Sequence, residues 1–184
     1  SALAEAGYAV WSLEYRRTGD AGGGWPGSFD DIKQGLAFTS RLADYPVDLD
    51  RMLIMGHSAG GHLALLAAGE SDGIQAVVGL AAITNIIEYS RGNNSCQTAT
   101  IGFMGGTYEE HPVAYRAANP ANQSLHPKTI LLQGDMDAIV PVGQSRLTGA
   151  GTVIFEGAGH FDWIHPGTEA YRLLLTTLED IFRK

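Results

Sequence analysis

The sequence has few cysteines, few basic residues and no long apolar run, and each shortage excludes a class of protein. Cys96 is the only cysteine among 184 residues, so neither an intrachain disulfide nor a cysteine-based zinc site can form. No apolar run reaches about 18 residues, so we expect no membrane span. The 12 lysines and arginines against 20 acidic residues give a net charge of −8, which argues against a nucleic-acid partner.

Motifs for cofactors and metals are also lacking. The three glycines at 22–24 are not followed by the Lys-Ser/Thr pair of a phosphate-binding loop, and no dinucleotide fingerprint or metal-ligand spacing occurs. We therefore expect no cofactor, no metal and a small-molecule partner. The apolar fraction of 45% and the length suit one globular domain over residues 1–184.

The start of the chain carries no visible targeting segment. Residues 1–7 resemble the end of a helix that runs into a strand, so we expect the chain to begin in mid-fold. The single cysteine and the missing signal favour a cytoplasmic location, although a start in mid-fold weakens that inference. The sequence does not indicate an oligomeric state.

Short apolar runs alternate with helical patterns along the chain. Strands are expected at residues 8–14, 52–55, 75–82, 129–132 and 152–155, and helices from Ser28 to about Leu42, over 59–68 and over 168–182. Ser28, with Asp31 three places on, predicts a capping-box-like start for the first helix. This alternation predicts an α/β fold, with a mostly parallel sheet and helices on both faces.

A long segment over residues 83–128 shows neither the helical nor the strand spacing of apolar residues. It contains glycine, asparagine, proline and several aromatic residues, and we expect it to be irregular. A segment of this length inside a compact domain is usually functional. We therefore expect residues 83–128 to form a lid or pocket-wall insert.

Residues 56–60, Gly-His-Ser-Ala-Gly, match the G-x-S-x-G nucleophile elbow. In this motif Ser58 occupies a strained strand-to-helix turn, and glycine is expected at both outer positions because side chains there would clash with backbone. The helix that follows directs its first N–H groups at the serine, so the Ala59 N–H is expected in an oxyanion hole. A plain glycine-rich turn is the alternative, which the apolar run before and the Ala/Leu helix after disfavour.

A serine hydroxyl needs a base, and His160 is the best placed histidine. It directly follows the strand expected at 152–155, within Gly-Ala-Gly-His-Phe. His57 and His62 are tied to the elbow's own turn and helix, which keeps them from approaching the hydroxyl. The other histidines lack a strand-end setting and are His111, His126 and His165. A solvent-facing loop histidine is the alternative for His160.

Two carboxylates compete to orient the imidazole, since Asp135 and Asp137 both follow the strand at 129–132. Asp137 is favoured because the apolar residues 139–141 turn the chain back under the loop. Asp135, directly after Gly134, is better suited to brace the turn. The order Ser58, Asp137, His160 is that of the α/β-hydrolase architecture.

A set of motifs then resembles a known family. They are Glu14-Tyr15-Arg16-Arg17, Gly24-Trp25-Pro26, Gly56-His57-Ser58-Ala59-Gly60-Gly61-His62-Leu63-Ala64, Gly134-Asp135-x-Asp137-x-x-Val140-Pro141 and Gly157-x-Gly159-His160-Phe161. The chain resembles the esterase and formamidase-like branch of the α/β-hydrolase superfamily over essentially its whole length. The resemblance implies that Ser58 is the nucleophile, His160 the general base and acid, and Asp137 its orienter.

Two features depart from that family. A His-Gly-Gly-type motif, whose N–H groups complete the oxyanion hole, is absent and would lie upstream of Ser1; losing a hole donor costs about 2.7–4 kcal/mol. Only ten residues separate Pro141 from Thr152, so the usual helix there should be stunted or absent. An incomplete portion of a longer hydrolase is favoured over a naturally shortened protein, because a retained triad implies use.

The expected activity is hydrolysis of small carboxylic esters through an acyl-enzyme. The alternatives are an amide or peptide hydrolase of the formamidase or acyl-peptidase type, and a decayed hydrolase that binds an acyl ligand or a partner. Four residues could line the substrate pocket, although core packing is as good an explanation for the aromatic ones: Trp25, His57, Phe103 and Trp163.

Overall fold

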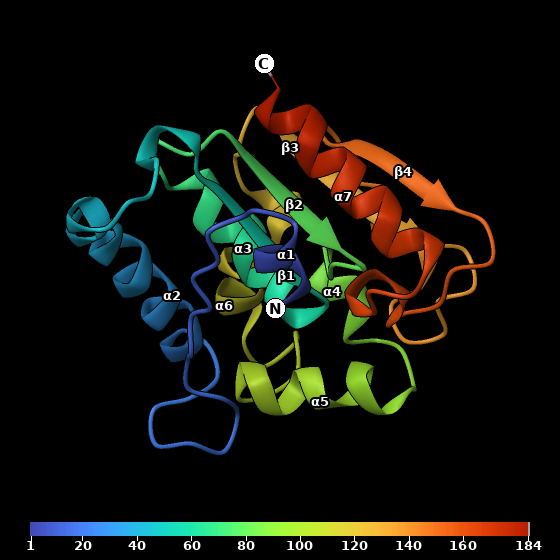
Figure 1. Cartoon of the computed structure of the whole chain (residues 1–184). Helices are drawn as coiled ribbons and strands as arrows, with labels where there is room; N and C mark the ends of the chain where they lie inside the picture. Colours follow the sequence, from blue (N-terminus) through green and yellow to red (C-terminus); the bar gives the residue numbers. More distant parts are fainter. Residues whose placement is uncertain (184) are drawn as a thin grey trace.

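A computed structural model describes residues 1–183, and its centre is a four-stranded sheet (Figure 1). The strands are β1 (Leu53–His57), β2 (Ala76–Leu80), β3 (Thr129–Gly134) and β4 (Gly151–Phe155). They lie in the order β1-β2-β3-β4, and every neighbouring pair is parallel. The predicted parallel α/β fold is therefore confirmed.

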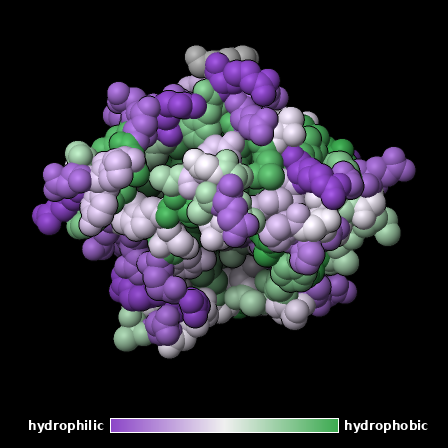
Figure 2. All heavy atoms as spheres, in the orientation of Figure 1, coloured by the Kyte–Doolittle hydropathy of each residue, from purple (hydrophilic) through white to green (hydrophobic). Residues whose placement is uncertain are grey.

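Helices cover both faces of the sheet, as the alternation of side chains along β2 requires. Ala76, Val78 and Leu80 share a buried cluster with α7 (Glu169–Phe182). Val77, on the opposite face, packs with α3 (Ala59–Gly69). Because each face is covered, all five residues of β2 are buried and apolar or glycine. Apolar and hydrophilic side chains are interspersed on the outer surface (Figure 2).

Two of the three predicted helices, at 59–68 and 168–182, form as expected. Helix α3 follows the elbow directly and buries most of its length. Helix α7 is amphipathic and starts at Thr168, whose hydroxyl accepts a hydrogen bond from the Tyr171 N–H. Within residues 1–183, no helix is both long and apolar enough to cross a membrane.

The prediction of a strand at residues 8–14 is wrong. After the short helix α1 (Ala2–Glu5), these residues pair with no strand of the described chain. Val10 and Trp11 are 49% and 43% exposed, whereas Leu13 packs beside Gly35. The apolar, aromatic-rich run favours extended backbone, but a strand also needs a partner, which local sequence does not supply.

The capping box predicted at Ser28 is also wrong. Helix α2 (Gly27–Phe38) begins one residue earlier, after Pro26, and continues as a 3₁₀ helix over Thr39–Asp44. The Ser28 hydroxyl instead donates to the Arg16 carbonyl and accepts from the Gly24 N–H. Asp31 binds the Arg16 guanidinium at 2.7 Å. Both polar side chains thus fix the glycine-rich loop rather than the helix end.

The segment 83–128 is more regular than predicted. It contains α4 (Ile86–Tyr89), α5 (Ser95–Met104) and α6 (Pro112–Ala117). These helices are too short to display a helical period clearly, although Asn94 and Gln97 form a capping box at the start of α5. Before β4 only a 3₁₀ turn occurs, at Val142–Ser145, so the predicted loss of a full helix is confirmed.

Candidate functional site

The loops after three parallel strands meet at one edge of the sheet. Ser58 follows β1, Asp137 follows β3 and His160 follows β4. Carboxyl ends of parallel strands lie side by side, and ligands of open α/β sheets bind there. The order of elements alone therefore brings these three residues to a common edge.

Ser58 adopts the strained backbone of an elbow. Its φ of +56° and ψ of −119° lie where side-chain-bearing residues rarely occur, and such conformations cost about 1–3 kcal/mol. The Ser58 N–H donates to the Leu80 carbonyl at 2.9 Å, and its carbonyl accepts from the His62 N–H at 3.1 Å. These bonds to β2 and α3 hold the turn on both sides.

The glycine requirement of the elbow differs from the prediction. A Cβ at Gly56 would lie 2.1 Å from the Gly60 carbonyl oxygen, as expected. A Cβ at Gly60 would meet nothing nearer than the Tyr15 hydroxyl at 4.0 Å, so the predicted clash at this position is wrong. The tight approach is at Gly61, where a Cβ would lie 2.7 Å from the Ala82 Cβ. Helix α3 approaches β2 through Gly61, one residue beyond the motif.

The start of α3 supplies a free donor beside Ser58. Ala59 is the first residue of the helix and is exposed, and an N–H at this position has no partner inside the helix. The partial positive charge of the helix N-terminus lies at the same place. This N–H is the group predicted to stabilise an oxyanion.

His160 and Asp137 form a buried pair. His160 Nδ1 lies 2.7 Å from Asp137 Oδ2, and each residue is only 7% exposed. Asp137 Oδ1 accepts hydrogen bonds of 2.8 Å from the N–H groups of Ile139 and Val140. The apolar turn at 139–141 thus supplies backbone donors that orient the carboxylate.

These contacts keep Asp137 ionised. Burial raises the pKa of the Asp137 carboxyl, but the hydrogen bonds from His160, Val140 and Ile139 outweigh it and leave the pKa below its usual value. An ionised Asp137 accepts the proton on His160 Nδ1. The lone pair of the neutral imidazole is then on Nε2.

Asp135 has a different partner. Its Oδ1 accepts from the Gly157 N–H at 2.7 Å, and the residue is exposed. The Met136 N–H donates to the Ala158 carbonyl at 3.1 Å. Asp135 therefore braces the loop that carries His160, whereas Asp137 contacts the imidazole itself.

Gln133 is a site residue that sequence reasoning missed. It lies in β3 and is 2% exposed, and its Nε2 donates to Asp137 Oδ2 at 3.2 Å and to the Val140 carbonyl at 3.0 Å. A lone polar side chain at the end of a buried strand was the available signal. Its amide binds Oδ2 of the carboxylate, whereas the backbone donors of the turn bind Oδ1.

The two histidines nearest Ser58 in sequence, His57 and His62, hydrogen-bond to backbone carbonyl oxygens. His57 Nε2 lies 2.8 Å from the His160 carbonyl, and His62 Nε2 bonds to the Ala118 carbonyl. Burial lowers the pKa of both imidazoles, that of His62 to about 4. Within residues 1–183 no hydrogen bond joins the Ser58 hydroxyl to His160; in unliganded enzymes such bonds are often long and tighten when substrate binds.

The residues predicted to line a pocket lie in different environments. Trp25 is half-buried and stacks on Phe29 at 5.4 Å. Its backbone N–H donates to the carbonyl of the half-buried Phe103 at 2.8 Å. Trp163 is fully buried against Phe155, so core packing explains it better. Phe161 is 60% exposed, and its ring lies 5.0 Å from that of His160.

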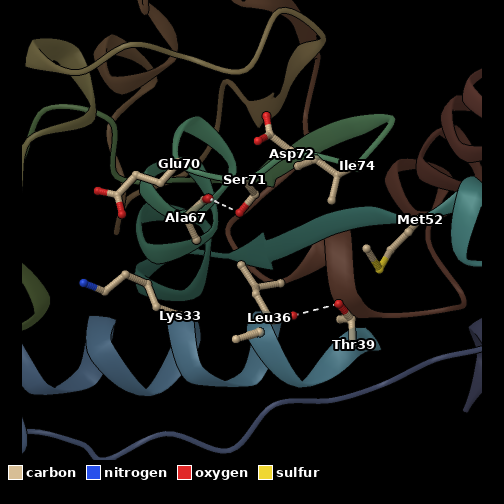
Figure 3. A pocket seen from close by; sticks show the side chains of 10 residues that line it. Lys33, Leu36, Thr39, Met52, Ala67, Glu70, Ser71, Asp72 and Ile74 are labelled. Atoms are coloured by element: carbon tan, nitrogen blue, oxygen red, sulfur yellow. Dashed lines mark hydrogen bonds between the residues drawn. The ribbon is translucent and has the colours of Figure 1, made fainter. Parts of the chain in front are cut away.

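A separate cavity of about 310 Å³ lies between α2 and the end of α3. Among the residues that line it, Figure 3 shows the apolar Leu36 and Met52 and the charged Lys33, Glu70 and Asp72. Met52 precedes β1 and Ser58 follows it, so the cavity is at the other end of that strand. It contains none of the candidate triad. Among residues 1–183, no three His, Cys, Asp or Glu side chains gather as metal ligands.

Comparison with known proteins gives consistent matches. A family model described as BD-FAE matches residues 1–150. Two Mycobacterium tuberculosis proteins, Esterase LipQ and Probable carboxylic ester hydrolase LipM, are 29% and 26% identical over 79% of this chain. The chain spans only 38% of the length of each.

Solved structures share the fold. A truncated carbohydrate esterase from gut microbiota is 21% identical, with a TM-score of 0.77 over 94% of this chain and 74% of its own. Esterase B from Lactobacillus rhamnosis is 20% identical, with a TM-score of 0.79 over 99% of this chain and 69% of its own. An acetyl ester-xyloside bifunctional hydrolase from Caldicellulosiruptor lactoaceticus is 20% identical, with a TM-score of 0.74 over 92% of this chain and 70% of its own.

Proposed function

The chain belongs to the BD-FAE family, an esterase family of the α/β-hydrolase superfamily, and from this premise we propose that it cleaves small carboxylic esters as a serine hydrolase. Ser58 is the nucleophile, His160 the general base and acid, and Asp137 the residue that orients the imidazole. The observation that carries the proposal is the buried 2.7 Å contact between His160 Nδ1 and Asp137 Oδ2, at the sheet edge where Ser58 is strained.

In the first half-reaction, His160 Nε2 takes the proton of the Ser58 hydroxyl as Oγ attacks the ester carbonyl carbon. A bond forms between Oγ and carbon, and the carbonyl electron pair moves onto oxygen. The ionised Asp137 stabilises the imidazolium. The intermediate then expels the alcohol, which takes its proton from His160, and leaves an acyl group on Ser58.

In the second half-reaction, water replaces the alcohol. His160 removes a proton from water as it attacks the acyl carbon, and returns that proton to Ser58 Oγ when the acid leaves. The Ala59 N–H donates to the oxyanion in both steps. A His-Gly-Gly-type segment, which would supply a second donor, is absent from the 184 residues.

The segment 83–128 forms the wall of the pocket in this proposal. It contacts the loop of the acid, since the Tyr89 hydroxyl and the Asn94 amide both donate to the Ile139 carbonyl. The insert is too short for a large separate lid, which favours small acyl groups. The carbohydrate esterase and the acetyl ester hydrolase among the similar structures make acetylated sugars the first natural substrates to try.

Turnover of a series of 4-nitrophenyl esters tests this proposal. We expect the acetate to be hydrolysed faster than long-chain esters, and Ser58→Ala to abolish the reaction without unfolding the protein. An amide or acyl-peptide hydrolase would also cleave the matched anilides, which an esterase should leave essentially intact. Retained ester turnover in folded Ser58→Ala would contradict the assignment of the nucleophile.

A further inference from the structure

We propose that His57 is a positioning residue that holds the general base in place through a hydrogen bond to the backbone of His160. This inference rests on the proposed function and extends it to a residue outside the triad. His57 does not touch the reacting atoms in this account. It acts through the loop that carries His160.

The geometry links two parts of the site that are far apart in sequence. His57 is the last residue of β1 and directly precedes Ser58, whereas His160 lies 103 residues later, beyond β4. His57 Nε2 is 2.8 Å from the His160 carbonyl, and the two rings lie 4.5 Å apart, tilted by 50°. A single side chain therefore ties the strand of the nucleophile to the loop of the base.

Other contacts fix the neighbouring residues of that loop. Asp135 accepts from the Gly157 N–H and Asp162 from the Gly159 N–H, each at 2.7 Å. Asp137 holds the imidazole by its Nδ1. The bond from His57 reaches the backbone of His160 itself, so it restrains the point from which the imidazole projects.

The protonation state of His57 fits this role. A carbonyl oxygen accepts only, so His57 Nε2 must carry a proton. Burial lowers the pKa of His57, so near neutral pH the ring is neutral and holds its one proton on Nε2. A neutral ring also adds no second positive charge beside His160 when that imidazole is protonated during the reaction.

Three substitutions separate positioning from general packing. His57→Gln places an amide nitrogen near the position of Nε2, His57→Asn has the same polarity but too short a reach, and His57→Leu has no donor. His111→Leu is the matched control, since His111 is exposed and caps nothing with its side chain. Each variant is first checked for an unchanged thermal unfolding midpoint.

Two readouts follow. The first is the rate at which a fluorophosphonate labels Ser58. For His57→Gln and His111→Leu we expect this rate to stay within about threefold of the wild-type rate. Labelling should be about 10–100-fold slower for His57→Asn and His57→Leu, since misplaced catalytic groups lose rate steeply. The second is the far-downfield proton resonance of His160 Nδ1–H, assigned by its loss in His160→Gln. It should persist in His57→Gln and shift or broaden in the other two.

The outcomes are distinct. A wild-type labelling rate and an unchanged resonance in His57→Leu and His57→Asn would overturn the positioning role. An equal loss of labelling rate in all three His57 variants would overturn it too. A folded wild type that labels no faster than Ser58→Ala would overturn the proposed function instead. In that case the resonance still decides: its survival in His57→Gln alone supports positioning, and its survival in every His57 variant contradicts it.

Discussion

At the scale of single residues, the site separates two aspartates that are only two positions apart. Asp137 contacts His160, whereas Asp135 accepts a hydrogen bond from the backbone of Gly157. We expect Asp137→Asn to lower kcat by about 10³–10⁴-fold, because the amide favours the wrong tautomer of the imidazole. Asp135→Asn keeps an oxygen that can accept from Gly157 and should lower kcat far less. Steady-state kinetics on one ester would decide, and the reverse ranking would exchange their roles.

Gln133 offers a second prediction at this scale. Its buried amide donates to both Asp137 Oδ2 and the Val140 carbonyl. Gln133→Leu therefore leaves the Val140 carbonyl buried without this donor. We expect the free energy of unfolding in urea to fall by about 1–3 kcal/mol. Gln133→Met provides the same test with a more flexible side chain. Unchanged stability in both variants would mean that water or relaxation replaces these bonds.

At the scale of elements, α3 makes the elbow depend on Gly61 more than on Gly60. A Cβ at 61 would overlap Ala82, so Gly61→Ala should lower stability, by an amount typical of overpacking, about 1–3 kcal/mol. Gly60→Ala finds open space inside a helix, where alanine is favoured over glycine by about 0.5–1 kcal/mol. Thermal unfolding of both variants is the measurement, and a larger loss for Gly60→Ala would contradict this packing.

The same helix carries a pH-dependent contribution through His62. In the folded protein burial lowers the pKa of His62 to about 4, whereas a histidine in the unfolded chain has a pKa of about 6.5. The unfolded state therefore binds more protons in between, and stability falls as pH drops through this window, by about 3 kcal/mol. His62→Gln, which can still donate to the Ala118 carbonyl, should flatten the pH dependence of the unfolding free energy. Equal slopes for both proteins would contradict it.

Which elements could be predicted depended on what defines each of them. Helix α7 and strand β2 carry their period and apolar composition in their own residues, so local pattern was enough. Residues 8–14 have a strand composition but no partner strand within residues 1–183, and pairing is a property of the whole sheet. Helices α4, α5 and α6 were missed because a few turns do not establish a period.

At the scale of the whole molecule, Ser58, Asp137 and His160 lie at one edge because each follows a parallel strand, and the sequence indicates these strands. The hydrogen bonds that link their loops cannot be predicted from the sequence in this way. The contacts of His57 with the His160 carbonyl and of Gln133 with Asp137 join loops by side chains whose direction depends on packing. Local pattern therefore predicts which loops lie at the same edge of the sheet, whereas the hydrogen bonds between those loops are visible only in the structure.

The proposed function requires that this fold present Ser58 as an activated nucleophile. The most direct test is the intact mass of the chain after exposure to a fluorophosphonate, with Ser58→Ala as the control. We expect one covalent adduct on the wild-type protein and none on the variant. A folded wild-type chain without an adduct, or an adduct that persists in Ser58→Ala, would contradict it.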